Sequence, residues 1–229
     1  MTSLLDVSHL SKEYGGPSAA VSVLRDVSFN LLEAGTLALE GESGSGKSTV
    51  LHLIAGLDAP SGGSILIGGK QVVGMSDAES AELRRRHIGI IFQQFNLVPS
   101  LSVRANIAFH ARLGDQFDPA WADHLADRIG LADHLEKYPE ALSGGQQQRV
   151  AIARTLAARP KLILADEPTG NLDEETADNV LKLMLDSAAS AGAAILMVTH
   201  SARQAARMSR RLLLSHGVVQ ERPAQTAAQ

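Results

Sequence analysis

The stretch GESGSGKS at residues 41–48 decides the fold, because its glycines, lysine and serine have the spacing of the Walker A pattern. Glycines let backbone N–H groups close around phosphate oxygens, and Lys47 adds a positive charge for the outer phosphates. Ser48 offers a hydroxyl to Mg²⁺, and a helix that starts here adds its partial positive charge. An ordinary Gly- and Ser-rich turn is the alternative. We assign to ATP binding the residues Gly41, Glu42, Ser43, Gly44, Ser45, Gly46, Lys47, Ser48 and Thr49.

The flanks of this loop favour phosphate binding over a simple turn. Residues 36–41 read as a strand that runs into the loop, and residues 47–55 read as a helix that Gly56 ends. Strand, loop and helix in this order are the context in which the pattern binds nucleotides. Neighbouring segments predict a mixed α/β chain, with β-rich runs at 21–32, 64–67 and 88–92 and a polar helix at 78–86.

The middle of the chain reads as a helical insert. From residue 103 to residue 158 the β signal disappears, and Ala-rich stretches are broken by glycine and proline. Apolar runs at 162–165 and 194–198, separated by a helix at 174–187, are typical of central parallel strands. We therefore expect one α/β domain over residues 1–229, with a core at 1–92 and 160–220, a helical insert at 93–159 and a disordered tail at 221–229.

The composition excludes several classes of function. The formal net charge is −4 and the Lys and Arg residues are scattered, so we expect no nucleic-acid partner. The absence of cysteine rules out disulfides and thiolate metal sites. No apolar run approaches the roughly 18 residues that a membrane span needs. We therefore expect a cytoplasmic protein that reaches a membrane only through a partner.

A second motif, LILADE at residues 162–167, is an apolar run that ends in two carboxylates. Open α/β sheets bind their ligands at the carboxyl ends of the strands, which is where these two acids stand. Asp166 suits Mg²⁺ through its water shell, and Glu167 is expected to polarise the attacking water as a general base. The alternative is a pair of solvated acids that cap a strand.

The sequence LSGGQ at residues 142–146 selects one family among the proteins with a phosphate-binding loop. Ser143 and two glycines precede an Ala-rich helix at 147–158, and such a helix start suits a phosphate. By itself the segment could be a helix cap. Together with the two motifs above it resembles the ABC ATPases, whose signature is Leu-Ser-Gly-Gly-Gln, and the resemblance runs from about Leu4 to about Gln220.

This resemblance implies the P-loop ABC ATPase fold. That fold has a RecA-like parallel-sheet core, an N-terminal antiparallel β subdomain and an inserted α-helical subdomain. It also implies ATP and Mg²⁺ as cofactors, with Ser48, Gln93 and Asp166 as the metal ligands and Glu167 and His200 as the catalytic residues.

The resemblance gives roles to single residues that are weak signals alone. It places Tyr14 as the aromatic that stacks on adenine, Gln93 as the glutamine that ligates Mg²⁺ or positions water, and His200 as a donor to the γ-phosphate. Alone, such a tyrosine is more often a packing residue and such a histidine a surface residue. The implied nucleotide contacts also include Ser143, Gly144, Gly145, Gln146 and Asp173.

The resemblance further implies two protein partners. Each ATP site in ABC ATPases is completed by a second subunit, so we expect a dimer with another copy or with a sibling ATPase subunit. The stretch Gln93–Leu101 corresponds to the groove that receives a coupling helix from a membrane permease subunit. Phe95, Leu97 and Val98 are apolar loop residues that suit such a contact, and packing under the helical insert is the alternative.

The motifs GLD at 56–58 and ADEPTGNLD at 165–173 are similar to those of the macrolide-exporter and lipoprotein-releasing group, which also includes the cell-division ABC ATPase. Members of this group pair with membrane subunits that convey motion across the membrane. Amino-acid importer ATPases share much of these motifs, so that group remains an alternative. A soluble ABC ATPase is a further alternative. We expect an ATP-hydrolysing subunit on the inner face of the cell membrane, working in export, lipoprotein extraction or mechanotransmission.

Overall fold

The computed structural model describes residues 2–15 and 20–222 of the chain. The chain divides into two compact units, the first formed by Met1–Glu82 with Ala194–Gln229 and the second by Leu83–Ala193. The helix α2 (Asp77–Arg86) begins in the first unit and ends in the second. The second unit contains the expected helical insert, preceded by a strand at 88–91 and followed by a strand at 162–166 and a helix at 174–191.

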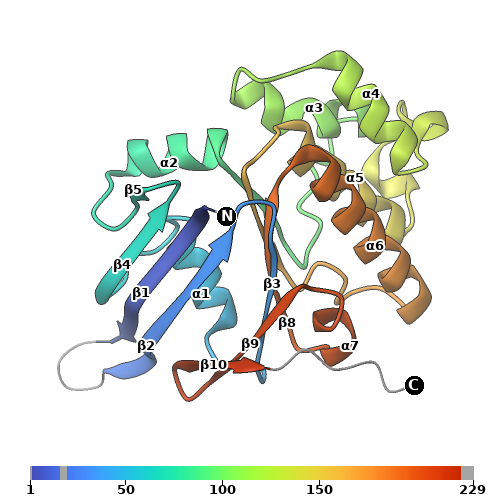
Figure 1. The fold of residues 1–229 in the computed structure, drawn as a ribbon. Coiled ribbons are helices and arrows are strands. Elements are labelled where there is room, and N and C mark those ends of the chain that lie inside the picture. Colours follow the sequence, from blue (N-terminus) through green and yellow to red (C-terminus); the bar gives the residue numbers. More distant parts are fainter. Residues whose placement is uncertain (1, 16–19, 223–229) are drawn as a thin grey trace. The chain divides into compact units, whose positions relative to one another are not determined.

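The first unit is built on a sheet whose strands follow the order β5-β4-β1-β2-β10-β9-β3-β8 (Figure 1). Its N-terminal part is antiparallel, as expected, because β1 (Ser3–Tyr14) pairs with β2 (Val21–Leu32) and β4 (Gly62–Ile67). The short strand β5 (Lys70–Gln71) extends this part at its edge.

The other part of this sheet holds the parallel strands that lead into the phosphate-binding loop. β3 (Thr36–Glu40) pairs in parallel with both β8 (Ala194–Thr199) and β9 (Arg210–Ser215). β10 (Val218–Arg222) joins the two parts, because it pairs with β9 on one side and with β2 on the other. The helix α1 (Lys47–Ile54) follows β3, and the short helix α7 (Ala202–Ala205) follows β8.

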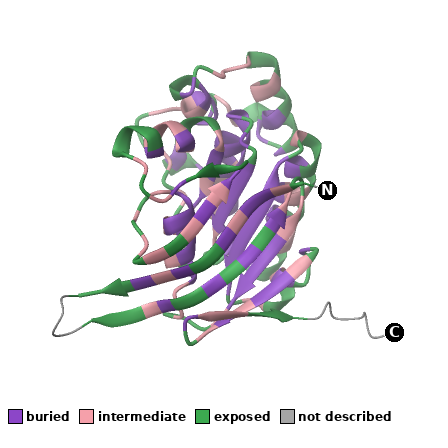
Figure 2. Ribbon diagram, turned by 60° about the vertical axis from the view of Figure 1, so that its left-hand side comes forward, coloured by how far each residue is buried: buried purple, intermediate pink, exposed green. Residues whose placement is uncertain are grey.

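Burial follows the sequence pattern of each strand. Leu37, Ala38 and Leu39 of β3 and the whole run 194–198 of β8 are 0% exposed, as continuous apolar runs in parallel strands require. Along β2, buried and exposed residues alternate from Val27 to Leu31 (Figure 2), so one face of this strand packs on the core and the other meets solvent.

The predicted runs miss four of the described strands, β1, β5, β9 and β10, and the predicted tail begins too early. The strand β1 is absent from the predicted runs because its register with β2 shifts repeatedly and His9 adopts a φ of 51°, so bulges interrupt the period-two alternation. The predicted tail is wrong at its first two residues: Glu221 and Arg222 complete β10, where they pair with Leu212 and Arg211. Residues 223–229 lie outside the described part of the chain.

The second unit packs helices around a parallel pair of strands. β6 (Ile88–Ile91) pairs with β7 (Leu162–Asp166), which confirms both predicted runs as strands. The helices are α3 (Val103–Leu113), α4 (Pro119–Arg128), α5 (Gly144–Ala157) and α6 (Glu174–Ala191), with single 3₁₀ turns at Ala132–His134 and Pro139–Ala141. α5 is the central helix, because it contacts α3, α4, α6 and β6. Within the described residues, no helix combines the length and the apolar character needed to cross a membrane.

A buried ion pair stands behind the phosphate-binding loop. Glu40, the last residue of β3, accepts two hydrogen bonds from the Arg211 guanidinium on β9, at 2.8 Å from Nε and 3.0 Å from Nη2. Their side chains are only 7% and 4% exposed. Charges taken out of water in this way are stable only as a pair, because each alone would keep its desolvation cost.

This pair predicts a strongly non-additive effect on stability. Glu40→Met alone should lower the free energy of unfolding by about 3–5 kcal/mol, because it leaves the buried Arg211 without its partner. Arg211→Met should cost less, because Arg222 Nη1 lies 4.0 Å from Oε2 of Glu40 and remains as a partner. The double variant, with two apolar side chains of similar length, should recover most of that loss. Urea unfolding of the four proteins measures both effects, and two small, additive losses would show that the pair is not buried as described.

Candidate nucleotide-binding and hydrolysis site

The Walker A loop of the first unit turns the end of β3 into the start of α1. Gly46 caps α1 with a φ of 100°, a conformation that only glycine adopts at little cost. A Cβ at this position would also lie 2.9 Å from Cγ1 of Val23 on β2. The loop therefore needs glycine at this residue both for its conformation and for its contact with the neighbouring strand.

Lys47 lies inside the loop rather than in solvent. It is 6% exposed, and its Nζ donates to the backbone carbonyls of Gly41 and Glu42 at 2.9 and 2.8 Å. Ser45 Oγ is buried and has no hydrogen-bond partner among the described residues. An ammonium held by main-chain carbonyls and an unused hydroxyl in one glycine loop fit a ligand rich in negatively charged oxygens.

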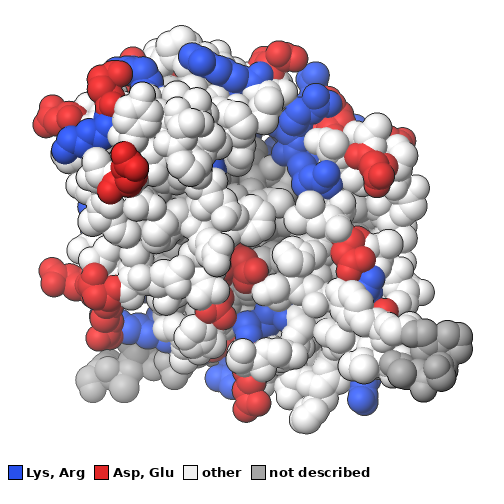
Figure 3. Space-filling view, turned by 180° about the vertical axis from the view of Figure 1, so that it is seen from behind, with Lys and Arg blue, Asp and Glu red and all other residues white. Residues whose placement is uncertain are grey.

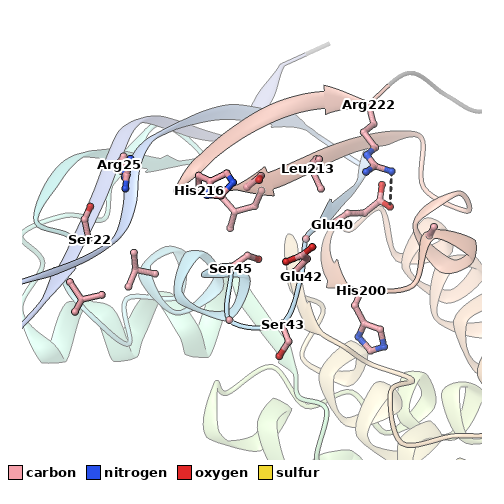
Figure 4. A pocket seen from close by; sticks show the side chains of 18 residues that line it. Ser22, Arg25, Glu40, Glu42, Ser43, Ser45, His200, Leu213, His216 and Arg222 are labelled. Carbon is pink, nitrogen blue, oxygen red and sulfur yellow. Dashed lines mark ion pairs between the residues drawn. The ribbon is translucent and has the colours of Figure 1, made fainter.

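A cavity of about 930 Å³ borders this loop within the first unit (Figure 4). Its walls come from residues 41–45 of the loop, from β2, from the β9–β10 hairpin and from His200. In Figure 4, the side chains of Ser43 and His200 point away from the hairpin residue His216. The cavity borders residues 41–45 of the loop, but Lys47, Ser48 and Tyr14 do not line it.

His200 is presented at the carboxyl end of β8, directly after the buried residue Thr199, and its own side chain is exposed. The next residue is Ser201. Its Oγ accepts a hydrogen bond from the backbone N–H of Gln204 and so caps α7. Serine is one of the preferred residues at this capping position.

The second unit holds the two acids of the LILADE motif. Residues 162–165 of β7 are fully buried, and Asp166 and Glu167 follow at the carboxyl end with partial exposure. Glu167 adopts a φ of 42°, the left-handed region that costs a residue with a Cβ about 1–2 kcal/mol. Strain of this kind is concentrated at functional sites, where the surrounding structure holds it in place.

Gln93 lies next to Glu167 in the same unit. A Cβ on Gly170 would lie 3.1 Å from Nε2 of Gln93 and 3.3 Å from Oε2 of Glu167, so both side chains border this glycine. The amide of Asn171 donates to the carbonyl oxygen of Gln93 at 2.9 Å and fixes the backbone there. The structure therefore brings together an amide and a carboxylate that the sequence separates by more than seventy residues.

The signature residues form the amino end of α5. Ser143 accepts a hydrogen bond from the backbone N–H of Gln146, and the Gln146 side chain accepts one from the backbone N–H of Ser143, so the two make a capping box. A Cβ on Gly145 would lie 2.5 Å from Cγ2 of Thr176 on α6, which makes glycine obligatory. Asp173 caps α6 through the backbone N–H of Thr176.

Two further residues of α5 hold the segments around this group, and the sequence motifs do not contain them. Gln148 donates from its buried amide to the carbonyl oxygen of Pro168, directly after Glu167. Arg154, 4% exposed, donates to the carbonyl oxygens of Asn96 and Phe95 at 2.6 and 3.0 Å. The one available signal was the presence of long polar side chains in a helix that is otherwise Ala-rich and apolar.

The predicted site residues thus fall into two groups. The first unit carries the Walker A loop, Tyr14 and His200, and the second carries Gln93, Asp166, Glu167, the signature residues and Asp173. A glycine loop that ends in a buried lysine at a helix start, with an apolar strand that ends in two carboxylates, defines a P-loop nucleotide hydrolase.

Comparison with known proteins identifies the family. A family model described as ABC transporter matches residues 24–170, and the chain belongs to this family. It has the P-loop ABC ATPase fold and is an ATP-binding and ATP-hydrolysing subunit of an ABC transporter.

Several relatives match nearly the whole chain. The lipoprotein-releasing system ATP-binding protein LolD of Shewanella frigidimarina is 41% identical over 220 residues, which are 95% of this chain and 92% of that protein. The uncharacterized ABC transporter ATP-binding protein YbbA of Escherichia coli K12 is 40% identical over 95% of this chain and 97% of its own length. A dimeric structure of the ATP-binding cassette MJ0796 in a post-hydrolysis state with ADP and Pi superposes with a TM-score of 0.86 and 33% identity, covering 96% of this chain and 99% of that one.

Arg154 also affects a neighbouring histidine. Burial of His110 on α3, and then the positive charge of Arg154, lower the pKa of His110 from 6.5 to about 4. Burial likewise lowers the pKa of the Arg154 guanidinium below its ordinary value. The imidazole therefore stays neutral in the folded protein at pH values where an unfolded histidine is already charged.

This difference predicts how stability depends on pH. As pH falls from 6.5 to 4, the unfolded chain binds a proton at His110 before the folded chain does, so the free energy of unfolding falls. The contribution of His110 is at most about 1.4 kcal/mol per pH unit. His110→Gln, which cannot take up the proton, should flatten the slope measured by urea unfolding over this range. Equal slopes for the two proteins would contradict the buried, neutral histidine.

Proposed function

We propose that two ATPase subunits bind two ATP molecules between them, each held by the Walker A loop of one subunit and the signature loop of the other. The observation that carries this proposal is the exposed amino end of α5 at Ser143. Its capping box satisfies groups of its own chain, while the helix end keeps its partial positive charge for a phosphate. The related cassette MJ0796, whose structure is described as dimeric, supports a dimer of this chain with a second copy or a sibling subunit.

In each site the Walker A residues hold the phosphates. The backbone of Gly41 to Gly46 surrounds them, Lys47 gives up its two carbonyl contacts for the outer phosphates, and Ser48 and Thr49 contribute hydroxyls. Ser43 and His200 point to the same side in Figure 4, where the partner's signature loop is to approach, and His200 donates a hydrogen bond to the γ-phosphate. Tyr14 stacks on adenine.

Hydrolysis requires a base beside the attacking water. Glu167 accepts a proton from that water, which attacks the γ-phosphorus as the bond to the leaving ADP breaks. Gln93, next to Glu167, orients the water through its amide, and the strained backbone at Glu167 fixes where the carboxylate points. Loss of the γ-phosphate then removes the contact between the two subunits, and the dimer opens.

The candidate metal ligands Ser48, Gln93 and Asp166 fit Mg²⁺, because hydroxyl, amide and carboxylate oxygens are the hard donors it prefers. When bound, Mg²⁺ neutralises charge on the β- and γ-phosphates. In this proposal Asp166, at the end of the buried strand β7, holds the water shell of the ion.

The membrane partner contacts the Gln93–Leu101 segment in this proposal. Phe95, Leu97 and Val98 are half-buried there, so each keeps apolar surface for a partner, and Arg154 fixes the backbone of the segment. On the face drawn in Figure 3, both acidic and basic side chains are visible, and the basic ones are grouped most closely near the upper right. The permease subunit keeps this chain on the inner face of the cell membrane.

The names of the relatives support lipoprotein release as the work of the complex. LolD proteins at 41% identity carry that function in their name, and the match covers 95% of this chain. We therefore place the chain in the lipoprotein-releasing and macrolide-exporter group, where ATP-driven closure and opening move a membrane subunit.

Two variants separate binding from hydrolysis. Glu167→Gln should keep ATP binding but lower turnover by about 100-fold or more, because the amide cannot accept the proton. In excess MgATP it should also accumulate as a dimer, visible as a doubled mass by light scattering. Lys47→Ala should remain monomeric, because it binds ATP weakly. A Glu167→Gln protein that stays monomeric in MgATP, or hydrolyses ATP at a near-normal rate, would falsify the proposal.

A further inference from the structure

Tyr14 does not stand free at the end of β1, although it is 43% exposed. Its hydroxyl donates to Oδ2 of Asp58 at 2.8 Å, in the loop that follows the phosphate-binding helix α1. A surface tyrosine that only packed would not need this hydrogen bond to the loop that follows the helix carrying Lys47 and Ser48.

Lys12 completes the group from the other side. Its Nζ donates to Oδ1 of Asp58 at 2.7 Å and to the carbonyl oxygen of Ala59 at 2.6 Å. The same Nζ lies 4.6 Å from the centroid of the Tyr14 ring, so a cation covers one face of that ring. The Lys12 side chain is 11% exposed, whereas Tyr14 is 43% exposed, so the tyrosine keeps accessible surface that Lys12 does not cover.

The charge states agree with this arrangement. Burial opposes ionisation of Asp58, but hydrogen bonds from Lys12, Tyr14 and the backbone N–H of Ala59 outweigh it and hold the pKa of the carboxyl below its ordinary value. Burial and the hydrogen bond to Asp58 raise the pKa of Tyr14, so the hydroxyl stays a donor. Two backbone ties fix the same loop against β1: Glu13 N–H donates to Ser61 Oγ, and Ser61 N–H donates to the carbonyl oxygen of Ser11.

We propose that Lys12 and Asp58 are positioning residues that hold the Tyr14 ring as a preformed platform for adenine. Lys12 occupies one ring face, Asp58 fixes the hydroxyl, and the base stacks on the face that remains. The inference rests on the proposed role of Tyr14 in stacking on adenine. It adds that the platform is tied to the loop that follows α1, so the base site and the phosphate site are connected through that helix and its following loop.

If Lys12 and Asp58 position the ring, releasing it should weaken binding of the adenine base and leave binding of the phosphates unchanged. Asp58→Ala and Tyr14→Phe both release the ring while keeping it present, so each should raise the KM for ATP by between about twofold and tenfold. The kcat should change by less than about twofold, because the reacting groups are untouched. The affinity for inorganic tripolyphosphate, which has no base, should stay unchanged when measured as inhibition of ATP hydrolysis.

Three further variants make the result decisive. Tyr14→Leu removes the ring and should raise the KM for ATP beyond either tether variant, again without affecting tripolyphosphate. The double variant Tyr14→Phe with Asp58→Ala should equal Asp58→Ala alone, because both remove the same tether. Asp26→Asn, which deletes an equally charged partner of His9 elsewhere on the same strand pair, is the matched control and should leave ATP and tripolyphosphate affinities unchanged.

The outcomes separate this inference from the function on which it rests. If Tyr14→Leu leaves the KM for ATP unchanged, the stacking role itself is wrong. If Tyr14→Leu raises that KM but Asp58→Ala and Tyr14→Phe do not, stacking stands and the positioning role is overturned. If Asp58→Ala weakens tripolyphosphate as much as ATP, Asp58 supports the phosphate helix rather than the ring, and the inference is again overturned.

Discussion

The turn between β3 and α1 is the constraint on which the first unit depends. A loop that surrounds phosphates with backbone N–H groups must reverse the chain sharply, and Gly46 does so with a φ of 100° against the side chain of Val23. The strand before the turn has to be immobile for the loop to keep its shape. β3 meets this need because it is buried between β8 and β9, and because the Glu40–Arg211 pair joins its last residue to β9.

The helix α1 that follows this turn links the phosphate-binding loop to the loop beside Tyr14. α1 begins with Lys47 and leads into the loop that contains Asp58, and Asp58 holds the ring of Tyr14. In the second unit, α5 has a comparable position. Its amino end presents the signature residues, and its body holds the backbone beside Glu167 through Gln148 and beside Phe95 through Arg154. Each group of site residues therefore depends on one helix that is fixed at several points.

The sequence predicts this structure well where a motif or a long apolar run exists. The Walker A loop, the strands at 36–41, 162–165 and 194–198, and the helices around them are all found. The strand β1 could not be predicted because bulges break its alternation. The strand β10 could not be predicted because its residues are stabilised by pairing with β9 rather than by a pattern of their own. The contacts of Arg154, Gln148 and Lys12 depend on tertiary structure, and no local pattern encodes which carbonyl or carboxylate each side chain reaches.

The central claim is that each chain carries two halves of different sites, which only a second chain completes. Mixing two inactive variants tests it most directly: Lys47→Ala, which lacks phosphate binding, and Ser143→Arg, which fills the exposed end of α5. In a mixed dimer one site combines the two defects and the other site is intact. Because neither variant forms an intact site with itself, the ATP-driven dimers are mixed ones with one intact site of two, so ATPase activity should recover to at most about half of the original. A mixture that remains as inactive as either variant alone would contradict the account.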